Sequence, residues 1–416
     1  MRILITTFGT RGDIQPFIAL GIGLKDAGHA VAICTSEGYR SFVEEHQLDY
    51  VFMSNELLQL SQDGLDGTGG VVGTFKTIQK IPPAVRNMMD DEWNAAVAFK
   101  PDLIIYHPKC LGSLHVAEKL NIPAIASLPL PFYTPTRAFP VPFMSGIRLG
   151  PWFNLLSYKI MGLSSGMYTK ATNDFRAKVL RLPPLRRFPD LFVRADGSPV
   201  PILYPYSPHV LPVPDDFPSH AHVTGYWFLS QAAGWQPDPE LESFLGSGPP
   251  PVYVGFGSMG GIGGQKRARI VIDALKKSGQ RGLLATGWGG IKTSDSSDDL
   301  YVVDAVPHDW LFPRVSTVVH HGGAGTTAAG LRAGKPTIVC PFLGDQPFWG
   351  RIVEQVGVGP KPIPQTQLTA DRLAEAIHIA TRDTDMQQRA EELGRKIREE
   401  DGVACAVEII NAMAYH

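Results

Sequence analysis

The segment HHGGAGTTAAGLRAGKPTIVCPFLGDQ, from His320 to Gln346, constrains the fold more than any other part of the chain. The residues before it, from Ser316, are typical of a buried parallel strand, and the Gly- and Thr-rich stretch predicts a tight turn and a helix start. A second apolar run, beginning at Pro336, predicts another strand that ends shortly before Asp345. This order of strand, helix and strand indicates a parallel sheet covered by helices.

The same segment has the chemistry of a nucleotide-sugar site. Glycines let backbone N–H groups approach a ligand closely, and the unpaired N–H groups of a first helical turn favour negative charge. The polar pair Asp345 and Gln346 lies at the carboxyl end of a strand, where open α/β sheets bind ligands. We therefore expect a diphosphate at the glycine turn and sugar hydroxyls at the polar pair.

The rest of the chain repeats the alternation of strands and helices. Strand signals occur at RILITTF, AVAICT, LIIYH and AIASLPL in the first half, and at VYVGFGSM, RGLLATGW and LYVVDAV in the second. A chain of 416 residues exceeds the size of a single core. We predict an α/β protein with two facing Rossmann-like, doubly wound parallel-sheet domains, residues 1–232 and 251–398, and an interdomain cleft. A linker rich in Pro and Gly spans 233–250, and a helix over 399–416 is placed to cross back to the first domain.

Two segments of the first half lack this alternation. Residues 61–74 are rich in Gly and Asp without periodicity, which predicts a loop. The span 129–189 is rich in aromatic residues, Met and Pro, and we expect it to form an apolar wall beside the cleft.

Composition excludes several classes of protein. There are 38 Lys and Arg against 40 Asp and Glu, so no basic footprint for nucleic acid exists. The four cysteines are scattered without metal or disulfide spacing, which indicates reduced thiols and a cytoplasmic protein. The first residues predict a strand and turn rather than a signal peptide, and no apolar run is long enough to span a membrane.

The turn FGTRGDIQP places Asp13 at the start of a helix behind the first strand. Asp is a common helix cap, and a lone carboxylate can also serve as the base that deprotonates an attacking hydroxyl. Burial would raise its pKa, while the helix start would oppose that shift. His107, after LIIY, either orients Asp13, lines an acceptor site or is structural; Arg11 pairs with an acidic neighbour or contacts a phosphate.

The second half also contains G-x-G-x-x-G at Gly255, Gly257 and Gly260. This pattern formally matches a dinucleotide fingerprint, but a nicotinamide enzyme needs an acidic residue at the end of the next strand, and RGLLATGW has none. Ser258 can instead donate to a phosphate. His320 and His321 are adjacent, so on a strand they would face opposite sides, which argues against a metal site.

With HHGGAGTT, LRAGKPTIVCPFLGDQ, GTRGDIQP and VPHDWLFPR, nearly the whole chain resembles the sterol 3-beta-glucosyltransferases and their bacterial relatives. The segment YHPKCLGSLHVAEKLNIPAIASLPLPFYTPTRAFP is also similar to their acceptor domain. The resemblance implies the GT-B fold and an inverting, metal-independent transfer of glucose from UDP-glucose, a co-substrate, with no other cofactor. It implies a bulky apolar acceptor carrying a hydroxyl, with a sterol-like 3β-hydroxyl favoured.

Carried over residue by residue, the resemblance puts the base at Asp13; His107, at the end of its strand, is the second catalytic candidate. It puts diphosphate contacts at Ser258, His321, Gly323, Gly325 and Thr326, and hexose contacts at Asp345 and Gln346. Further donor-site candidates are Gly12, Arg11, Trp288, Val306, His320 and Thr327. The uracil-stacking Trp of the plant signature falls at Ala305, so Trp288 is the candidate replacement.

Other functions remain open at this point. The acceptor could be a polyketide or flavonoid, and a GT-B sugar-nucleotide epimerase or a non-catalytic binding protein could share the phosphate turn. We expect no nucleic-acid partner and no obligate protein partner, and peripheral membrane contact would suit an apolar acceptor.

Overall fold

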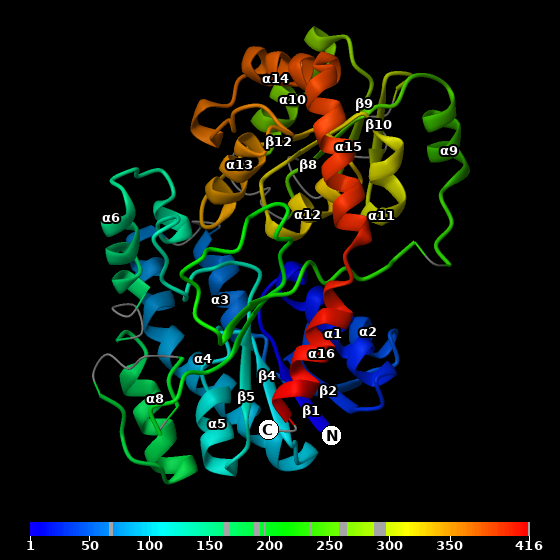
Figure 1. Cartoon of the computed structure of the whole chain (residues 1–416). Coiled ribbons are helices and arrows are strands. Elements are labelled where there is room, and N and C mark those ends of the chain that lie inside the picture. The colour runs from blue at the N-terminus through cyan, green and yellow to red at the C-terminus, as the bar shows by residue number, and fades with distance from the viewer. Residues whose placement is uncertain are drawn as a thin grey trace. The chain divides into compact units, whose positions relative to one another are not determined.

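The computed structural model describes residues 1–65, 70–161, 166–186, 192–194, 196–232, 234–257, 264–286 and 297–414, and the side chains of all of these except 61–65, 70–79 and 414. It divides into two compact units (Figure 1). The first unit comprises Met1–Pro208, Val213–Leu229 and Asp401–His416, and the second comprises His209–Pro212 and Ser230–Glu400.

The first unit is built on a seven-stranded parallel sheet in the order β3-β2-β1-β4-β5-β6-β7. Its strands are β1 (Arg2–Thr6), β2 (Ala30–Ser36), β3 (Asp49–Met53), β4 (Leu103–Tyr106), β5 (Ala124–Ser127), β6 (Ile202–Tyr204) and β7 (Ala221–Val223). The central strands are buried on both sides and therefore consist of continuous apolar runs, as in LIIY of β4.

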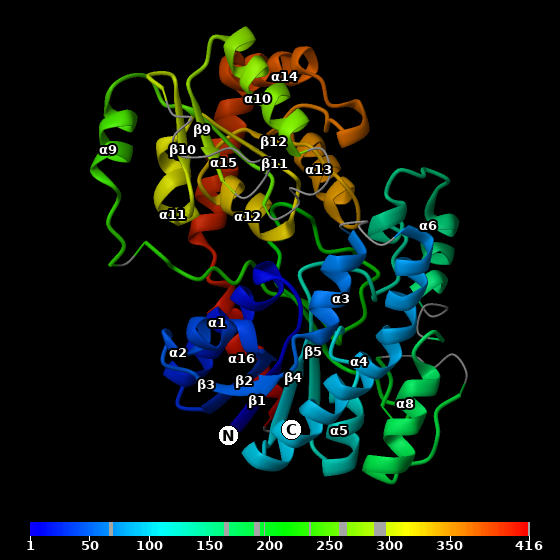
Figure 2. The same cartoon turned by 180° about the vertical axis from the view of Figure 1, so that it is seen from behind.

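Helices cover both faces of this sheet (Figures 1 and 2). They are α1 (Arg11–Asp26), α2 (Arg40–Glu44), α3 (Glu56–Leu65), α4 (Gly70–Phe99), α5 (Ser113–Leu120), α6 (Pro151–Ser157), α8 (Thr169–Phe175) and α16 (Gly402–Ala414). Helix α16 packs on α1 in a shared core, and Gly23 permits the approach, because a Cβ there would lie 2.3 Å from Val403 Cγ1. The loop predicted over 61–74 is wrong for two segments. Residues 61–65 belong to the end of α3, and residues 70–74 belong to the start of α4.

The second unit has a five-stranded parallel sheet in the order β10-β9-β8-β11-β12. Its strands are β8 (Val252–Gly255), β9 (Gly282–Ala285), β10 (Leu300–Val303), β11 (Thr317–His320) and β12 (Thr337–Val339). Its helices are α9 (Pro239–Gly246), α10 (Gly264–Ser278), α11 (His308–Leu311), α12 (Ala324–Arg332), α13 (Gln346–Gln355), α14 (Ala370–Arg382) and α15 (Thr384–Glu399). Two parallel, helix-covered sheets confirm the predicted α/β class.

Each sheet has a point where the strand order reverses. In the first unit β1 lies beside β4, with Thr6 level with Tyr106, and in the second β8 lies beside β11, with Gly255 level with His320. Loops that leave such neighbouring strands diverge and open a crevice at the carboxyl edge, which is where α/β sheets bind ligands. Within the described residues, no helix is long and apolar enough to cross a membrane.

Candidate functional site

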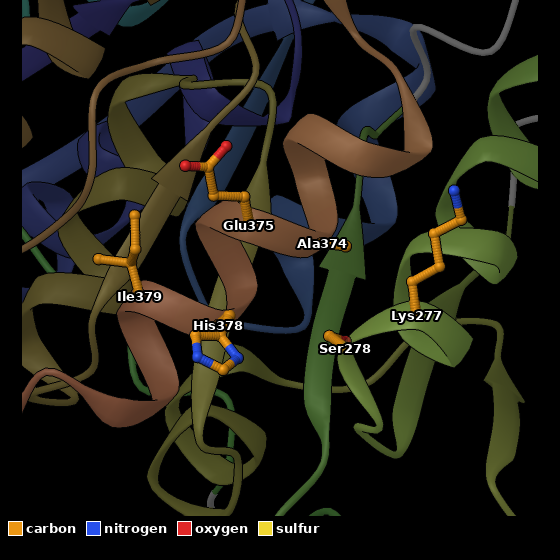
Figure 3. A pocket seen from close by; sticks show the side chains of 6 residues that line it. All are labelled: Lys277, Ser278, Ala374, Glu375, His378 and Ile379. Atoms are coloured by element: carbon orange, nitrogen blue, oxygen red, sulfur yellow. The ribbon is translucent and has the colours of Figure 1, made fainter.

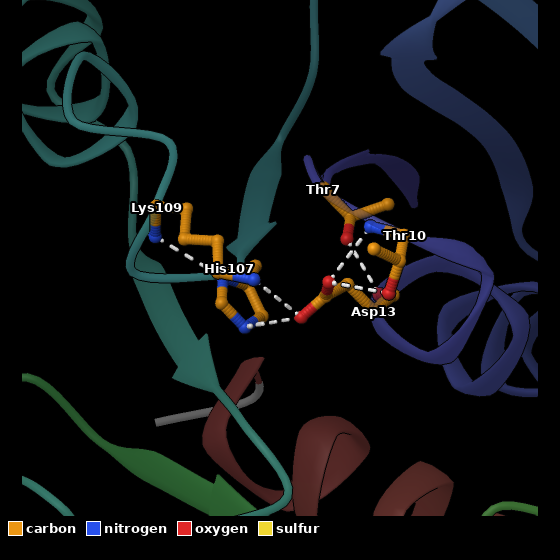
Figure 4. A network of polar contacts seen from close by, with 5 residues as sticks. All are labelled: Thr7, Thr10, Asp13, His107 and Lys109. Atoms are coloured by element: carbon orange, nitrogen blue, oxygen red, sulfur yellow. Dashed lines mark hydrogen bonds and ion pairs between the residues drawn. The ribbon is translucent and has the colours of Figure 1, made fainter. Parts of the chain in front are cut away.

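Asp13 occupies the third position of α1, directly beyond β1 at the reversal point of the first sheet (Figure 4). Its Oδ2 accepts hydrogen bonds from the Thr10 backbone N–H at 2.8 Å and from Thr10 Oγ1 at 3.2 Å, and so caps the helix. Gly9 makes room for this carboxylate, because its φ is +140° and a Cβ there would lie 2.2 Å from Oδ2. Capping and catalysis were equally open for Asp13 from the sequence, and the structure shows the cap.

The second oxygen of Asp13 faces residues from the loop after β4 (Figure 4). Lys109 Nζ donates to Oδ1 at 2.7 Å, and His107 Nε2 lies 3.7 Å from the same atom. The Lys109 backbone N–H donates to His107 Nδ1 at 3.1 Å, so the neutral imidazole carries its proton on Nε2, toward Asp13. The structure thus brings His107 to Asp13, one of the alternatives left open for it, and adds Lys109, which no sequence motif had singled out although it stands two residues beyond His107.

These contacts determine the charge of the site. Burial raises the pKa of Asp13, but the attraction of Lys109 and His107 and the hydrogen bonds from Lys109 and Thr10 outweigh it, so the pKa is lowered. Burial, with the nearby Lys109 charge, lowers the pKa of His107 to about 3. At neutral pH the pair is therefore a carboxylate beside a neutral imidazole. The raised pKa that burial alone would give Asp13 is absent because Lys109 is close.

A buried polar network lies behind this pair. Glu92 of α4 is 1% exposed, and its carboxylate accepts hydrogen bonds from the Gly112 N–H at 3.2 Å and from Ser113 Oγ at the start of α5. Ser113 Oγ in turn lies 2.6 Å from Thr6 Oγ1 at the end of β1. Burial raises the pKa of Glu92 to about 7. The network ties the loop that carries His107 to the strand that precedes Asp13.

Arg11 and Gly12 are exposed at the start of α1. The Arg11 guanidinium lies 4.7 Å from the Phe42 ring centroid, and its Nε donates to Gln15 Oε1 at 3.1 Å. Arg11 therefore contacts an aromatic ring and a side-chain amide, and not the acidic neighbour that the sequence suggested.

In the second unit the glycine turn follows β11 at the other reversal point. Gly322 has φ +95°, and a Cβ there would lie 2.7 Å from Val339 Cγ1 and 3.0 Å from the Gln346 carbonyl oxygen. Only glycine fits this position without strain. The close approach places the turn against the loop that carries the predicted hexose contacts.

The two histidines of the turn differ sharply. His320 ends β11, is fully buried and accepts the Gly322 N–H on Nδ1 at 2.9 Å. The His321 ring lies between two glycines: a Cβ at Gly323 would be 2.7 Å from its Nε2, and a Cβ at Gly257 would be 3.4 Å from its Cε1. Burial lowers the pKa of His321, a hydrogen bond with the backbone at Gly255 partly offsets this, and the ring is neutral at pH 7. Accessibility favours His321 over His320 as a ligand contact.

Helix α12 begins at Ala324 with Gly323 as its N-cap and no side-chain cap. The first-turn N–H groups, which include that of Gly325, therefore have no partner within the helix. Thr326 is partly exposed in this turn, whereas Thr327 is buried and its Oγ1 donates to the Gly323 carbonyl at 2.9 Å. The helix start can accept an anion, and Thr327 braces it from inside.

Asp345 and Gln346 begin α13 beyond β12. Asp345 is the N-cap residue, makes no side-chain cap bond and is partly exposed. Gln346 is 7% exposed, and its Oε1 accepts the Phe342 N–H at 2.7 Å and the Leu343 N–H at 3.3 Å. Gln346 therefore uses its oxygen to hold its own loop.

Val306 follows β10 at the carboxyl edge and packs against a buried apolar cluster of the second unit. Ser258 and Trp288 lie outside the described residues, so their predicted contacts stay predictions.

An open pocket of about 380 Å³ lies elsewhere in the second unit, between α10 and α14 (Figure 3). It is lined by Lys277, Ser278, Ala374, Glu375, His378 and Ile379. Lys277 and Ser278 end α10, immediately before the amino end of β9, so the pocket is at the opposite edge of the sheet from the glycine turn. Its position excludes it from the candidate site.

Two family descriptions match the chain. Residues 3–140 match the Glycosyltransferase family 28 N-terminal domain, and residues 290–413 match the Erythromycin biosynthesis protein CIII-like, C-terminal domain. The first match contains Asp13 and His107, and the second contains the glycine turn and Asp345.

Curated relatives match over nearly the whole chain. Sterol 3-beta-glucosyltransferase UGT80A2 of Arabidopsis thaliana is 37% identical over 98% of this chain, which covers 64% of that protein. UGT80B1 of the same plant is 35% identical over 98% of this chain and 67% of its own length. Sterol 3-beta-glucosyltransferase of Emericella nidulans is 35% identical over 99% of this chain and 30% of its own length. The chain thus spans about two thirds of the plant relatives and less than a third of the fungal one.

Solved structures share the fold. The glycotransferase of kitacinnamycin superposes with a TM-score of 0.71 at 16% identity, covering 99% of this chain and 98% of that one. The glycosyltransferase SnogD from Streptomyces nogalater superposes with a TM-score of 0.65 at 19% identity, covering 99% of both chains. These likenesses confirm the predicted GT-B fold class.

Proposed function

Because the chain belongs to the family of sterol 3-beta-glucosyltransferases, we propose that it transfers glucose from UDP-glucose to the 3β-hydroxyl of a sterol-like acceptor. The observation that carries the proposal is the whole-chain identity of 37% to a protein of that activity. The two reversal-point sites support it, because one offers a base for a hydroxyl and the other an uncapped helix start for a diphosphate.

The proposed chemistry is a single displacement with inversion. The acceptor oxygen forms a bond to the anomeric carbon as the bond from that carbon to the diphosphate oxygen breaks. The electron pair leaves with UDP, and the hydroxyl proton passes to Asp13. Since proton transfer is late in such a reaction, a carboxylate with a lowered pKa can still accept the proton.

Each neighbour of Asp13 has a part in this proposal. The acceptor hydroxyl would use Oδ1, because Thr10 engages Oδ2. The Nε2 proton of His107 points at the same oxygen and would hold its orientation as negative charge leaves it. Lys109 is half-exposed and can withdraw to make room.

In the second unit, the α12 start and the His321 ring would stabilise the charge that grows on the departing diphosphate. Asp345 would accept hydrogen bonds from hexose hydroxyls. No metal ion takes part in this proposal, because backbone and imidazole donors carry the charge stabilisation.

The test is product analysis with the purified chain, UDP-glucose and a panel of sterol, flavonoid and polyketide acceptors. Mass spectrometry should show a sterol glucoside, and the anomeric coupling by NMR should show the β-configuration. Asp13→Asn should reduce kcat by about 100-fold or more with UDP affinity nearly unchanged. Circular dichroism and the melting temperature provide the folding control.

Three results would contradict the proposal in distinct ways. Hydrolysis or epimerisation of the UDP-sugar without acceptor would indicate a sugar-nucleotide epimerase. Nucleotide binding without transfer to any acceptor would indicate a binding protein. Transfer to flavonoids or polyketides with no sterol product would support the glycosyl-transfer reaction but show that the acceptor is not a sterol.

A further inference from the structure

The loop over residues 107–113 is fastened at both of its ends. At its start, the His107 N–H donates to the Thr6 carbonyl at 2.9 Å. At its end, the Gly112 N–H donates to the buried carboxyl of Glu92 at 3.2 Å. The loop is therefore held by β1 on one side and by α4 on the other.

The same loop carries the residues that meet Asp13. Lys109 Nζ lies 2.7 Å and His107 Nε2 lies 3.7 Å from Asp13 Oδ1 (Figure 4). The Cys110 N–H donates to the His107 carbonyl at 2.8 Å, which closes a turn between them. Because the helix cap holds the Asp13 carboxylate in place, any shift of the loop changes the two distances to Oδ1.

A chain of hydroxyl groups connects Glu92 to β1 and back to the loop. Ser113 Oγ donates to Glu92 Oε2 and lies 2.6 Å from Thr6 Oγ1. Thr6 is also a hydrogen-bond partner of the Cys110 side chain. Each hydroxyl has a single proton to donate. While Glu92 is ionised it accepts from Ser113, so Thr6 donates to Ser113. Once Glu92 is protonated it can donate to Ser113, and Ser113 then donates to Thr6. The Thr6 proton is left to turn toward Cys110.

Glu92 exchanges its proton near neutral pH. Burial raises its pKa to about 7, and the groups that donate to it are neutral. Among the described residues, the ionisable groups that act on it are Asp91 of α4, Cys34 of β2 and Cys110 of the loop. Asp91 raises the pKa of Glu92 further, and burial raises the pKa of both thiols, so both are neutral at pH 7. Charged residues on the helices that pack on α4 have partners of their own, among them Glu56 of α3 with Asn87, Glu118 of α5 with Arg176 and Asp174 of α8 with Lys178.

We propose that Glu92 is a positioning residue of the site, and that its proton selects between the two hydrogen-bond directions that hold the loop. The ionised carboxyl accepts charge-assisted bonds, which are shorter and stronger than neutral ones, and so holds the end of the loop firmly. Protonation weakens these bonds and loosens His107 and Lys109 relative to Asp13. The effect of Glu92 on turnover rests on the proposed function, whereas its hold on the loop does not.

The test follows the His107 ring by NMR of protein labelled with 15N-histidine, between about pH 5.5 and 8.5. The ring itself stays neutral over this range, because its pKa is about 3. A change of its signals with a midpoint near pH 7 therefore reports Glu92, and Glu92→Gln should abolish it. Glutamine accepts from Gly112 and donates to Ser113, so this variant keeps the network without titrating.

Two further variants separate the hydroxyl chain from other effects. Ser113→Ala breaks the chain but leaves the Glu92 charge, so the response of the His107 ring should largely disappear. Asp91→Asn is the matched control, because Asp91 is the adjacent carboxylate of α4 and accepts the Ser54 N–H at 2.9 Å rather than a donor of the loop. It should keep the response and move the midpoint to lower pH, since Asp91 raises the pKa of Glu92.

Turnover supplies a second measurement. The kcat of the unaltered chain, relative to that of Glu92→Gln, should rise by about threefold from about pH 6 to 8 as the loop is held more firmly. The KM for UDP-glucose should not change, because the donor candidates lie in the second unit. A residue that only stabilised the fold would change the melting temperature without this pH-dependent ratio.

Four outcomes decide the matter. A His107 response that persists in Glu92→Gln, or that is absent from the unaltered chain, would overturn the inference. A response of full size in Ser113→Ala would also overturn it, because the charge would then act through space. Glycosyl transfer with a kcat ratio that is constant with pH would refute the role in turnover. The expected response without any glycosyl transfer would contradict the proposed function and support the inference.

Discussion

Replacing the buried carboxyl of Glu92 should change how stability depends on pH. Glu92 is 1% exposed, and its hydrogen-bond donors are the Gly112 N–H and Ser113 Oγ. Glutamine has nearly the same shape, and it can accept from Gly112 and donate to Ser113. The variant Glu92→Gln therefore keeps the network while removing its titration.

The magnitude follows from the raised pKa. Burial raises the pKa of Glu92 from 4.5 to about 7, which corresponds to about 3 kcal/mol at about 1.4 kcal/mol for each pH unit. Between pH 4.5 and 7 the folded protein keeps a proton that the unfolded chain has released. Stability from this group is therefore fully present below pH 4.5, falls as pH rises and is lost above pH 7. The Glu92→Gln variant has no carboxyl to titrate, so its stability should not fall between pH 4.5 and 7 for this reason.

The assay is urea unfolding of both proteins at several values between pH 4 and 8.5, followed by a signal from the first unit. The free energy of unfolding of Glu92→Gln, relative to the unaltered chain, should increase by about 3 kcal/mol across that range. Taking the difference cancels the other titrating groups. Glu44→Gln, at an exposed carboxylate beside exposed Arg40, is the control and should run parallel to the unaltered chain. Parallel curves for Glu92→Gln would refute the argument.

Three further changes test the two sites. Lys109→Met should raise the pKa of Asp13 and remove the hydrogen bond to its Oδ1. The kcat at neutral pH should therefore stay within about threefold of the unaltered value. A loss as large as that of Asp13→Asn would instead indicate that Lys109 takes part in the chemistry. Gly322→Ala forces a Cβ toward Val339 and an unfavourable φ, and should lower stability by about 1–3 kcal/mol and weaken UDP binding, as calorimetry can measure. Asp345→Ala should reduce the preference for UDP-glucose over UDP-galactose about tenfold in kcat/KM, and an unchanged ratio would remove it from hexose recognition.

The sequence predicted the parts of the fold that depend on local pattern. Nine of the strands were located from apolar runs in the sequence, and Asp13, His107 and His321 follow such strands, as expected. Strand β6 is a short run between Pro201 and Pro205, β7 is only half-buried, and β3 is partly exposed, so none of them gives a clear apolar pattern. Helix α4 was missed at its start because Gly70 and Gly73 weaken the helical signal there, and its interior Pro82 and Pro83 weaken it further.

The contacts that determine the protonation states of Asp13 and Glu92 could not be predicted from local pattern. Glu92 meets the start of α5 twenty residues along the chain, and its pKa depends on the depth of burial there. Lys109 reaches Asp13 across 96 residues only because β1 and β4 are neighbours, a fact of strand order that no local pattern contains. The buried polar side of α6 also has no sequence signal, because its Asn154 and Ser157 are ordinary surface residues by type.

The two interpretations of Asp13 that the sequence left open, cap and base, are compatible once its oxygens are considered separately. Oδ2 is engaged by Thr10 and sits against Gly9, so the helix start fixes the position of the carboxylate. Oδ1 points away from the helix, toward His107 and a lysine that is half-exposed. A freely rotating carboxylate would have to lose side-chain entropy when it meets an acceptor, whereas a capping one is already ordered. In the proposed reaction, capping is therefore what prepares Oδ1 to act as the base.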